Sequence, residues 1–346
     1  MKTEHILITD PTQQNEAIAR AAAHICAGEL VVFPTETVYG LGADATNEDA
    51  VRSIYTAKGR PSDNPLIIHI ASPEDAERYA VTNQTYYKLA AQFMPGPLTV
   101  ILPKRDNVPS AVTGGLDTVA VRCPSHPVAR ALIEASGVGI AAPSANLSGR
   151  PSPTKAAHAS EDLDGRVSMI LDGGECEVGL ESTIVALEGD VGTLLRPGAI
   201  TYDALCCVCR EVKVAPAVVA RLAENERPLS PGMKYRHYAP RAALTLLDGE
   251  DAAVLSFLQS LTKDKHVGIL CYDEEKAHLS GDAHLFTVGS KHDLQTQAHR
   301  LFSLLREVDD YPEITAVYAH LPSREGLGLA LYNRSIRAAA HTIKKI

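Results

Sequence analysis

Four polar segments carry the side chains with which this chain could do chemistry, and each of them follows or joins short apolar runs. The first segment, residues 33–45, places the hydroxyls of Thr35 and Thr37 on either side of a carboxylate. Its glycines, Gly40 and Gly42, permit close backbone approach to a ligand. A glycine-rich turn explains them equally well.

The second segment, residues 53–70, places two cations next to each other. Lys58 and Arg60 flank a glycine just after a predicted helix, Asn64 adds an amide between two prolines, and His69 lies in the next strand. Prolines restrict the loop and lower the entropy lost when an anion binds. A cation at a helix C-terminus also complements the helix dipole, and a strand histidine is often a core residue. Both alternatives stay open.

The third and fourth segments add guanidinium, hydroxyl and amide groups at strand ends. These residues are Arg122, Ser144, Asn146, Thr154, Ser182 and Arg196. Serine and asparagine in loops are often only turn formers. An arginine at a strand end, however, can bind a carboxylate or phosphate with two hydrogen bonds.

Motifs for other chemistries are missing from the sequence. It contains no GxGxxG, GxxxxGK[ST], GxSxG or HExxH pattern, and the 13 histidines show no metal-ligand spacing. Cys206 and Cys209 form one CxxC within an apolar run, which predicts buried core thiols. A polar array without a nucleophile–base pair suits a polyanionic substrate whose reaction depends on positioning and charge neutralisation, as in nucleotidyl transfer.

Chain length and net charge restrict the number of domains and the class of protein. The 346 residues favour two domains, and a formal net charge of -9 argues against a protein that coats nucleic acid by bulk electrostatics. No apolar run is long enough to span a bilayer, and the N-terminus lacks the features of a secretory signal. Seven cysteines in such a chain predict reduced thiols and a cytoplasmic location.

Hydrophobic periodicity predicts the elements that position these residues. A helix should begin with Asp10 as N-cap, followed by Pro11 and Gln13, and end at Gly28. We expect strands at 30–33, 66–70, 98–102, 119–122, 139–141, 169–172, 183–186 and 193–196, and helices at 49–57, 73–80 and 84–93. This mixture indicates an α/β or α+β fold and leaves the topology open.

The composition changes after Val212. We predict a first domain at 1–212, a proline-rich linker at 213–240 and a second domain at 241–346. In the second domain, strands are expected at 244–247, 267–272, 285–288 and 314–319. Helices are expected at 251–261 and 294–308 and at the C-terminus, the pattern of a small Rossmann-like module.

The motifs FPTETVYGLGADA, KGRPSDNPLIIHI, MPGPLTVILP, VAVRCP, APSANLSGRPSPT, ESTIV and LLRPGAIT occur in this order. On them the sequence resembles the Sua5/YrdC/YwlC family, the threonylcarbamoyl-AMP synthases. LSPGMKYRHYAPRAAL and GLGLALYNRSIRAA resemble the longer Sua5 form. The resemblance implies a YrdC-type twisted, open α/β sheet with a large positively charged cavity, plus a smaller C-terminal domain joined by a linker that covers the cavity.

The resemblance also implies an activity. The enzyme would make L-threonylcarbamoyladenylate and pyrophosphate from L-threonine, bicarbonate or CO2, and ATP. The product would pass to the tRNA threonylcarbamoyl transferase machinery for the N6-threonylcarbamoyl modification of adenosine 37. Mg2+ would arrive with ATP, with no metal ligand assigned to the protein.

The roles implied by the resemblance fall into three sets. The catalytic cations would be Lys58 and Arg60. ATP would be bound by Lys58, Arg60, Asn64, Thr118, Asn146, Thr154, Arg196 and the linker residue Tyr235. L-Threonine would be bound by Thr35, Thr37, His69, Arg122, Ser144 and Ser182, with the choice between Thr35 and Thr37 as the inward-facing residue left open.

Two other functions were weighed against this one. An RNA-binding module of the same fold would use the basic cavity for a phosphate backbone, but aromatic residues make up only 5% of the chain and Trp is absent. An oxidoreductase built on the second domain lacks the glycine fingerprint of dinucleotide binding.

Overall fold

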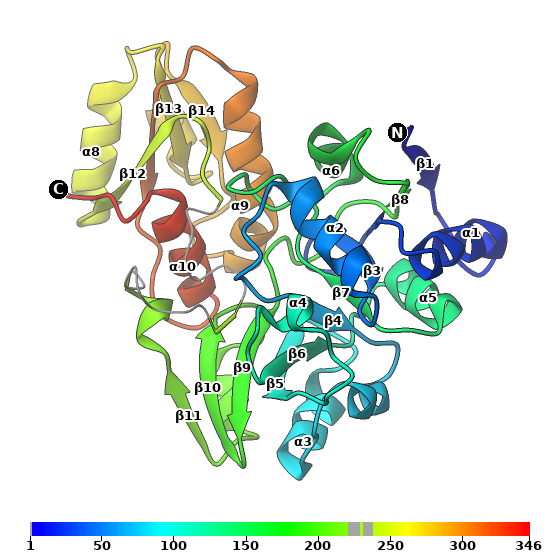
Figure 1. The fold of residues 1–346 in the computed structure, drawn as a ribbon. Helices are drawn as coiled ribbons and strands as arrows, with labels where there is room; N and C mark the ends of the chain where they lie inside the picture. Colours follow the sequence, from blue (N-terminus) through cyan, green and yellow to red (C-terminus); the bar gives the residue numbers. More distant parts are fainter. Residues whose placement is uncertain (1, 221–228, 231–237) are drawn as a thin grey trace. The chain divides into compact units, whose positions relative to one another are not determined.

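The computed structural model describes residues 2–220, 229–230 and 238–346 (Figure 1). The described chain divides into two compact units. One takes in the residues up to Ser148 and those from Ser152 to 230, and the other takes in Gly149–Pro151 and residues 238–346. Within these described ranges, no helix is both long and apolar enough to cross a membrane. The domain limits at 212 and 240 stay predictions.

The first unit is built on one mixed sheet of eleven strands. Its strands are β1 (Glu4–Leu7), β2 (Val31–Phe33), β3 (Gly40–Asp44), β4 (Ile67–His69), β5 (Leu98–Pro103), β6 (Thr118–Arg122), β7 (Ile140–Ala142), β8 (Met169–Asp172), β9 (Thr183–Glu188), β10 (Val191–Arg196) and β11 (Glu211–Val214). The spatial order is β1-β8-β2-β3-β7-β4-β6-β5-β9-β10-β11. The sheet contains both parallel pairs such as β4/β6 and antiparallel pairs such as β4/β7.

Short helices connect these strands. They are α1 (Asn15–Cys26), α2 (Glu48–Lys58), η1 (Pro73–Arg78), α3 (Gln84–Phe93), α4 (Ser110–Thr113), α5 (Pro127–Ser136), α6 (Ala156–Leu163), α7 (Tyr202–Cys206) and η2 (Pro216–Val218). Helices α1 and α5 lie side by side in Figure 1 and bury apolar residues such as Ile25 and Leu132 against β2 and β8. This arrangement confirms the predicted α/β class.

The start of the first helix was predicted wrongly. Helix α1 begins at Asn15, and Asp10 instead accepts a hydrogen bond from the backbone N–H of Thr12 at 2.9 Å. Gln14 holds the turn by accepting from the backbone N–H of Thr9 at 2.8 Å. Asp10 therefore closes a local turn, a conformation that competes with helix capping for the same side chain.

Neither explanation offered for Gly40 and Gly42, close backbone approach of a ligand or a glycine-rich turn, is correct. Gly40 and Gly42 lie in strand β3, which pairs with β2. A Cβ atom on Gly42 would lie 2.7 Å from Ile140 Cγ2 and 2.8 Å from Phe33 Cε1. The glycine is required because neighbouring side chains, not a ligand, occupy the space above the backbone.

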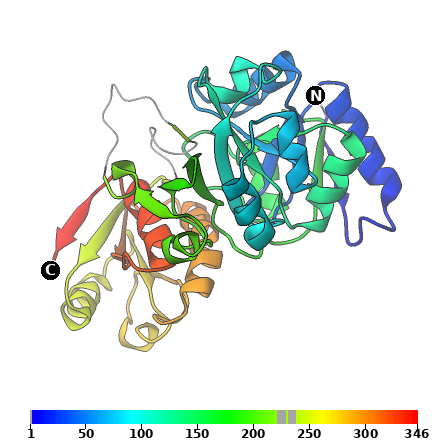
Figure 2. The same ribbon diagram turned by 90° about the horizontal axis from the view of Figure 1, so that it is seen from below.

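The second unit has a parallel sheet of five strands. They are β12 (Ala243–Asp248), β13 (Val267–Cys271), β14 (His284–Thr287), β15 (Ala316–His320) and β16 (Ile343–Lys345), in the order β14-β13-β15-β12-β16. In Figure 2 the red arrow of β16, where the chain ends, lies at the edge of this sheet beside β12. Every strand pair is parallel, which confirms the predicted Rossmann-like module.

Helices cover the sheet of the second unit. They are α8 (Asp251–Leu261), α9 (Leu294–Glu307) and α10 (Gly328–Ala338), with short η3 (Lys276–His278) and η4 (Val308–Asp310). Val254 and Leu258 of α8 pack on Leu247 and Ile269 of the sheet. Since side chains alternate along a strand, Leu246 and Leu270 point to the other face, where they line a pocket with residues of α9 and α10.

Candidate active site

The register of the sheet brings two predicted site residues together. Strands β4 and β6 are parallel, and His69 lies opposite Arg122 at their last paired position. On the other side of β4, His69 lies opposite Ile140 of β7. Because parallel strands end at the same edge of a sheet, both polar side chains meet there although 53 positions separate them in the sequence.

A buried ion pair lies at this edge. Arg122 Nη2 is 2.8 Å from Glu36 Oε1, and both side chains are almost fully buried, at 4% and 5% exposure. Glu36 Oε2 also accepts from the backbone N–H of Ser125 at 3.3 Å. Glu36 was noted in the sequence but was not placed in the site. Its partner is 86 positions away, so no local pattern could have revealed the pair.

Two nitrogens of the Arg122 guanidinium lack a hydrogen bond, although one of them is ion-paired. Nε and Nη2 have no hydrogen-bond partner among the described residues, because the Nη2 contact with Glu36 is an ion pair without hydrogen-bond alignment. These two nitrogens form the edge that binds a carboxylate with two parallel hydrogen bonds. Buried polar groups need partners, so this edge requires water or a ligand.

His69 is neutral at physiological pH. Burial, reinforced by the positive charge of Arg122, lowers the pKa of His69 from 6.5 to about 3. Its ring packs edge-on against Phe33 at 5.8 Å between ring centroids, and Nδ1 lies 3.2 Å from the carbonyl oxygen of Ile67. An uncharged imidazole therefore borders the arginine without competing for its anion.

The Thr35 hydroxyl is used within its own loop. Its Oγ1 donates to the Val38 carbonyl at 2.7 Å and accepts from the backbone N–H groups of Thr37 and Val38 at 3.2 Å each. Thr37 Oγ1 lies 2.9 Å from Thr35 Oγ1. The Thr35 hydroxyl stabilises the turn. The Thr37 hydroxyl makes fewer hydrogen bonds within the loop.

Lys58 holds the loop after β7. Helix α2 ends at Gly59, whose φ of +60° lies in the left-handed region. The buried Lys58 ammonium donates to the backbone carbonyls of Ser144 and Asn146. The Lys58 carbonyl accepts from the backbone N–H of Ser148 at 3.0 Å. Three predicted site residues, Lys58, Ser144 and Asn146, are thus in direct contact.

Arg60 and Asn64 form a second group. Arg60 Nη2 lies 3.4 Å from the Pro65 carbonyl, and its guanidinium carbon is 5.7 Å from the Tyr55 ring centroid. Beside them a surface hollow of about 600 Å³ opens along α2 and residues 59–62. Asn64 is fully buried, and both of its amide atoms lack a hydrogen-bond partner in the described part of the chain.

A third group joins the strands β5, β9 and β10. Arg196 donates from Nε to the Ser182 carbonyl at 3.0 Å and from Nη2 to Ser182 Oγ at 3.1 Å. Ser182 Oγ is 2.7 Å from Thr99 Oγ1. The site prediction omitted Thr99, although it stands in the quoted motif MPGPLTVILP.

The remaining predicted residues lie apart from these contacts. Thr154 is buried at the end of the loop after β7, and its N–H lies 3.4 Å from His158 Nδ1. Thr118 begins β6, at the end opposite Arg122. Glu181, absent from the site prediction, accepts from Ser152 Oγ at 2.6 Å. Tyr235 lies outside the described residues.

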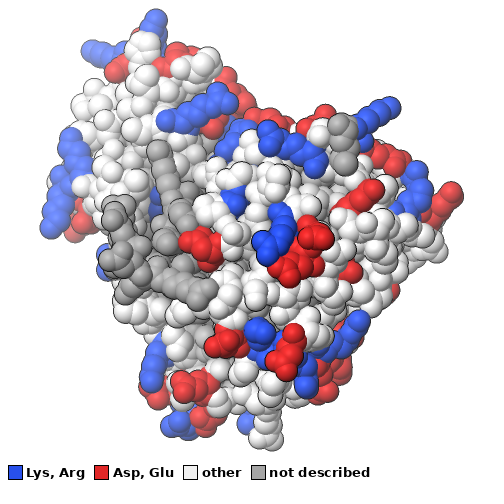
Figure 3. All heavy atoms as spheres, in the orientation of Figure 1, with Lys and Arg blue, Asp and Glu red and all other residues white. Residues whose placement is uncertain are grey.

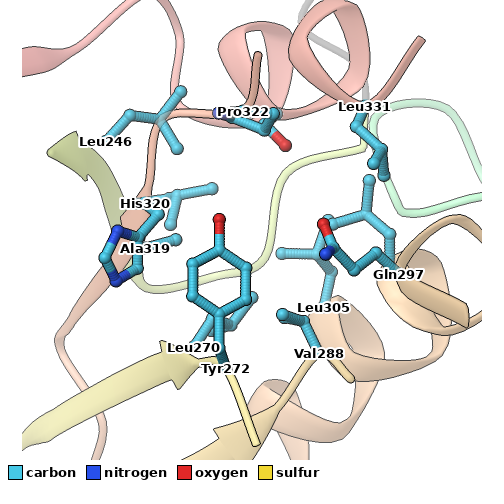
Figure 4. Close-up of a pocket in the computed structure, with 13 residues that line it drawn as sticks. Leu246, Leu270, Tyr272, Val288, Gln297, Leu305, Ala319, His320, Pro322 and Leu331 are labelled. Atoms are coloured by element: carbon cyan, nitrogen blue, oxygen red, sulfur yellow. The ribbon is translucent and has the colours of Figure 1, made fainter. Parts of the chain in front are cut away.

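The second unit contains a pocket of different character. Figure 4 shows the Tyr272 hydroxyl pointing between apolar side chains that include Leu246 and Leu305. The pocket volume is about 40 Å³, room for a few water molecules and too small for a nucleotide. The CxxC prediction was half wrong, because Cys209 is buried but Cys206 is exposed at the end of α7.

Surface charge gives no support to an RNA-coating role. On the face drawn in Figure 3, Lys and Arg side chains are interspersed with Asp and Glu. Proteins that track a phosphate backbone gather basic residues into a groove or stripe. This face therefore gives no support to the RNA-binding alternative.

Comparison with known proteins identifies the family. A family model described as "Telomere recombination" (Sua5, YciO, YrdC) matches residues 23–198, and one described as "Threonylcarbamoyl-AMP synthase, C-terminal domain" matches residues 200–340. The threonylcarbamoyl-AMP synthase of Bacillus subtilis is 45% identical over 345 residues, covering 98% of both chains. That of Schizosaccharomyces pombe is 38% identical, covering 97% of this chain and 92% of its own.

A solved structure extends the similarity to the fold. The crystal structure of Pyrococcus abyssi Sua5 complexed with L-threonine has a TM-score of 0.90 and 41% sequence identity, covering all of both chains. The similarity of sequence and fold extends over the whole chain and therefore covers both of its units. The chain belongs to the threonylcarbamoyl-AMP synthase family, in its long, two-domain Sua5 form.

Proposed function

We propose that this chain converts L-threonine, bicarbonate or CO2, and ATP into L-threonylcarbamoyladenylate and pyrophosphate. The observation that carries the proposal is that Nε and Nη2 of the buried Arg122 guanidinium have no hydrogen-bond partner among the described residues, a donor pair that suits the carboxylate of an amino acid. The relatives named threonylcarbamoyl-AMP synthase, and the P. abyssi structure named as a complex with L-threonine, support the same substrate.

The threonine seat is built around Arg122. Its Nε and Nη2 donate hydrogen bonds to the substrate carboxylate, and Glu36, ion-paired with the same Nη2, helps to hold the guanidinium in place. Neutral His69 and the Thr37 hydroxyl border the seat and accept or donate hydrogen bonds without adding charge. Ser144 and Ser182 supply further hydroxyls, and Thr35 acts through the turn that it closes.

The nucleotide is bound by the group of Arg60 and Asn64 and by the residues around Lys58. Arg60 neutralises phosphate charge, and the buried amide of Asn64 meets the nucleotide with its unused donor and acceptor. Lys58 contributes a nearby positive charge and holds the loop that carries Asn146. The other proposed contacts are Thr118, Thr154, Arg196 and Tyr235.

The chemistry needs no covalent enzyme intermediate. The amine of threonine attacks CO2 and loses a proton, which gives a carbamate. A carbamate oxygen then attacks the α-phosphorus of ATP, and the bond to the leaving pyrophosphate breaks. Fixed cations stabilise the charge that develops on the phosphates, and positioning of the two reactants lowers the entropic barrier.

Magnesium is proposed to enter with the triphosphate. In the described part of the chain, no three His, Cys, Asp or Glu side chains gather as a metal-binding group. Mg2+ commonly keeps several waters and binds through substrate phosphates, so it requires little from the protein. The ion would reduce the negative charge of the phosphates that the cations of this chain also meet.

The product is proposed to pass to the machinery that transfers threonylcarbamoyl to adenosine 37 of tRNA, and the enzyme to act in the cytoplasm. The first step is directly testable. Purified chain is incubated with ATP, Mg2+, bicarbonate and 14C-threonine, and the product is identified by mass spectrometry alongside pyrophosphate release. Product should require all three substrates and no RNA. Pyrophosphate release that continues without threonine would contradict the proposal.

A further inference from the structure

Three residues of the loop between β7 and α6 cluster with the second unit. Gly149–Pro151 belong to that unit by their contacts, whereas the chain up to Ser148 and from Ser152 onward belongs to the first. Two proposed nucleotide contacts, Asn146 and Thr154, stand on either side of this three-residue excursion. Whatever holds Gly149–Pro151 therefore acts on the residues that flank them through a few peptide bonds.

Arg306 of α9 holds this stretch. Its Nε and Nη2 both donate to the carbonyl oxygen of Pro151, at 3.1 and 2.7 Å. The Arg306 residue is only 4% exposed. Two residues before Pro151, the Gly149 carbonyl accepts from the backbone N–H of Ala239 at 3.2 Å. A buried guanidinium that donates twice to one carbonyl orients that peptide more strictly than a single donor.

A buried aromatic pair lies one helical turn from Arg306. Phe302 lies one helical turn before it on the same face of α9, and Tyr238 stacks on the Phe302 ring at 4.9 Å between centroids. Both aromatic residues are buried. Arg306 also lies in the last turn of α9, where a cation complements the helix dipole. The donor that meets Pro151 is therefore held by packing and by electrostatics.

The two ends of the loop are held within the first unit. The Lys58 ammonium donates to the Asn146 carbonyl, and the Lys58 carbonyl accepts from Ser148. At the other end, Ser152 Oγ donates to Glu181 Oε1 at 2.6 Å. Between these anchors, Arg306 donates to the Pro151 carbonyl and the Ala239 N–H donates to the Gly149 carbonyl.

We propose that Arg306 is a positioning residue for ATP. By orienting the Pro151 carbonyl, it keeps residues 146–154 in the conformation in which Asn146 and Thr154 meet the nucleotide. This inference rests on the proposed function, and it gives the C-terminal unit a part in the reaction. Arginine is required because the ammonium of lysine, a compact point charge, lacks the planar two-donor edge.

The test uses the full chain. Arg306→Ala and Arg306→Lys are compared with Arg300→Ala, a control on the same helix whose guanidinium contacts Thr287 instead. The Kd values for ATP and for L-threonine are measured separately by calorimetry, and KM and kcat by pyrophosphate release. Misplacing the residues that contact a ligand weakens their effect by about tenfold to a hundredfold. The Kd and KM for ATP should therefore rise at least about tenfold in both Arg306 variants. The Kd for threonine should not change, and added ethylguanidinium should restore ATP affinity to Arg306→Ala.

The outcomes separate this inference from the proposed function. A wild-type chain that binds ATP but makes no threonylcarbamoyladenylate would overturn the proposed function. An active wild type whose Arg306 variants bind ATP normally would overturn the positioning role, as would an equal loss of ATP and threonine affinity. If Arg306→Ala does not fold, as judged by its thermal melt, Arg306→Lys decides by the same comparison.

Discussion

Replacing Arg122 by lysine keeps a positive charge in the buried site but removes the Nε/Nη2 edge. In the proposed complex that edge donates two charge-assisted hydrogen bonds to the threonine carboxylate, and a lysine ammonium replaces at most one. Such a bond contributes about 1.5–3 kcal/mol, so the Kd for L-threonine should rise by about 10- to 150-fold. Calorimetry measures this, with ATP affinity expected to stay unchanged. Arg130→Lys, an exposed arginine beside Glu134, is the matched control.

The opposite half of the ion pair sharpens this test. Glu36→Gln leaves the Arg122 charge buried without a counter-charge, and breaking a buried pair from one side costs about 3–5 kcal/mol. Urea denaturation measures this loss. Threonine should stabilise Glu36→Gln more than it stabilises the wild type, because its carboxylate supplies the missing negative charge. Its affinity for this variant should be at least that of the wild type.

Two outcomes would exclude Arg122 as the binding site of the threonine carboxylate. If Arg122→Lys binds threonine as tightly as the wild type, the carboxylate is bound elsewhere. If Glu36→Gln loses threonine affinity in parallel with Arg122→Lys, the ion pair acts only as a structural support and the Nε/Nη2 edge of Arg122 is not the binding site of the carboxylate.

Three further predictions concern protonation, burial and packing. Because the folded pKa of His69 is about 3 against 6.5 ordinarily, the unfolded chain takes up the proton first as pH falls. Wild-type stability should therefore fall from pH 6.5 downward by about 1.4 kcal/mol per pH unit more than in His69→Gln, and parallel urea curves would contradict this. Asn64→Ala should weaken ATP binding without lowering the Tm, whereas Asn146→Ala should lower the Tm because its Nδ2 donates to a backbone carbonyl at 2.8 Å. Gly42→Ala should cost about 1–3 kcal/mol in urea denaturation, because its Cβ would lie 2.7 Å from Ile140.

Most of the strands and longer helices were predictable because their residues face a core and show it as periodicity. The predicted strand at 98–102 corresponds to β5 at Leu98–Pro103, and the predicted helix at 84–93 to α3 at Gln84–Phe93. Strand β3 was missed because its glycines are typical of a turn, while their actual cause is the Phe33 side chain. Strands β1 and β11 are short edges with half-exposed patterns, which carry little apolar signal.

The site was predictable by residue type but not by grouping. Arginine at the end of an apolar strand indicated a site at Arg122, since a surface cation there has no packing reason. The partnership with Glu36 depends on the pairing of strands distant in sequence, and local patterns do not encode it. The Lys58 ammonium was predicted to meet phosphate, and the structure shows it bound to backbone carbonyls of the loop that follows β7.

The polar groups that remain unsatisfied show how the site is prepared for its substrates. A buried donor or acceptor without a partner costs about 1–3 kcal/mol, so a fold retains such groups only where the remaining contacts offset them. Around Arg122 and Asn64 the offset comes from strands such as β4 and β6, whose apolar side chains are almost completely buried. Threonine would supply hydrogen-bond partners to Arg122, and ATP would supply them to Asn64. Each substrate would thus remove a destabilising contribution that is present in the free protein. Little binding energy is then lost to reorganisation of the protein, because the Arg122 edge and the Asn64 amide are already in place before the ligands bind.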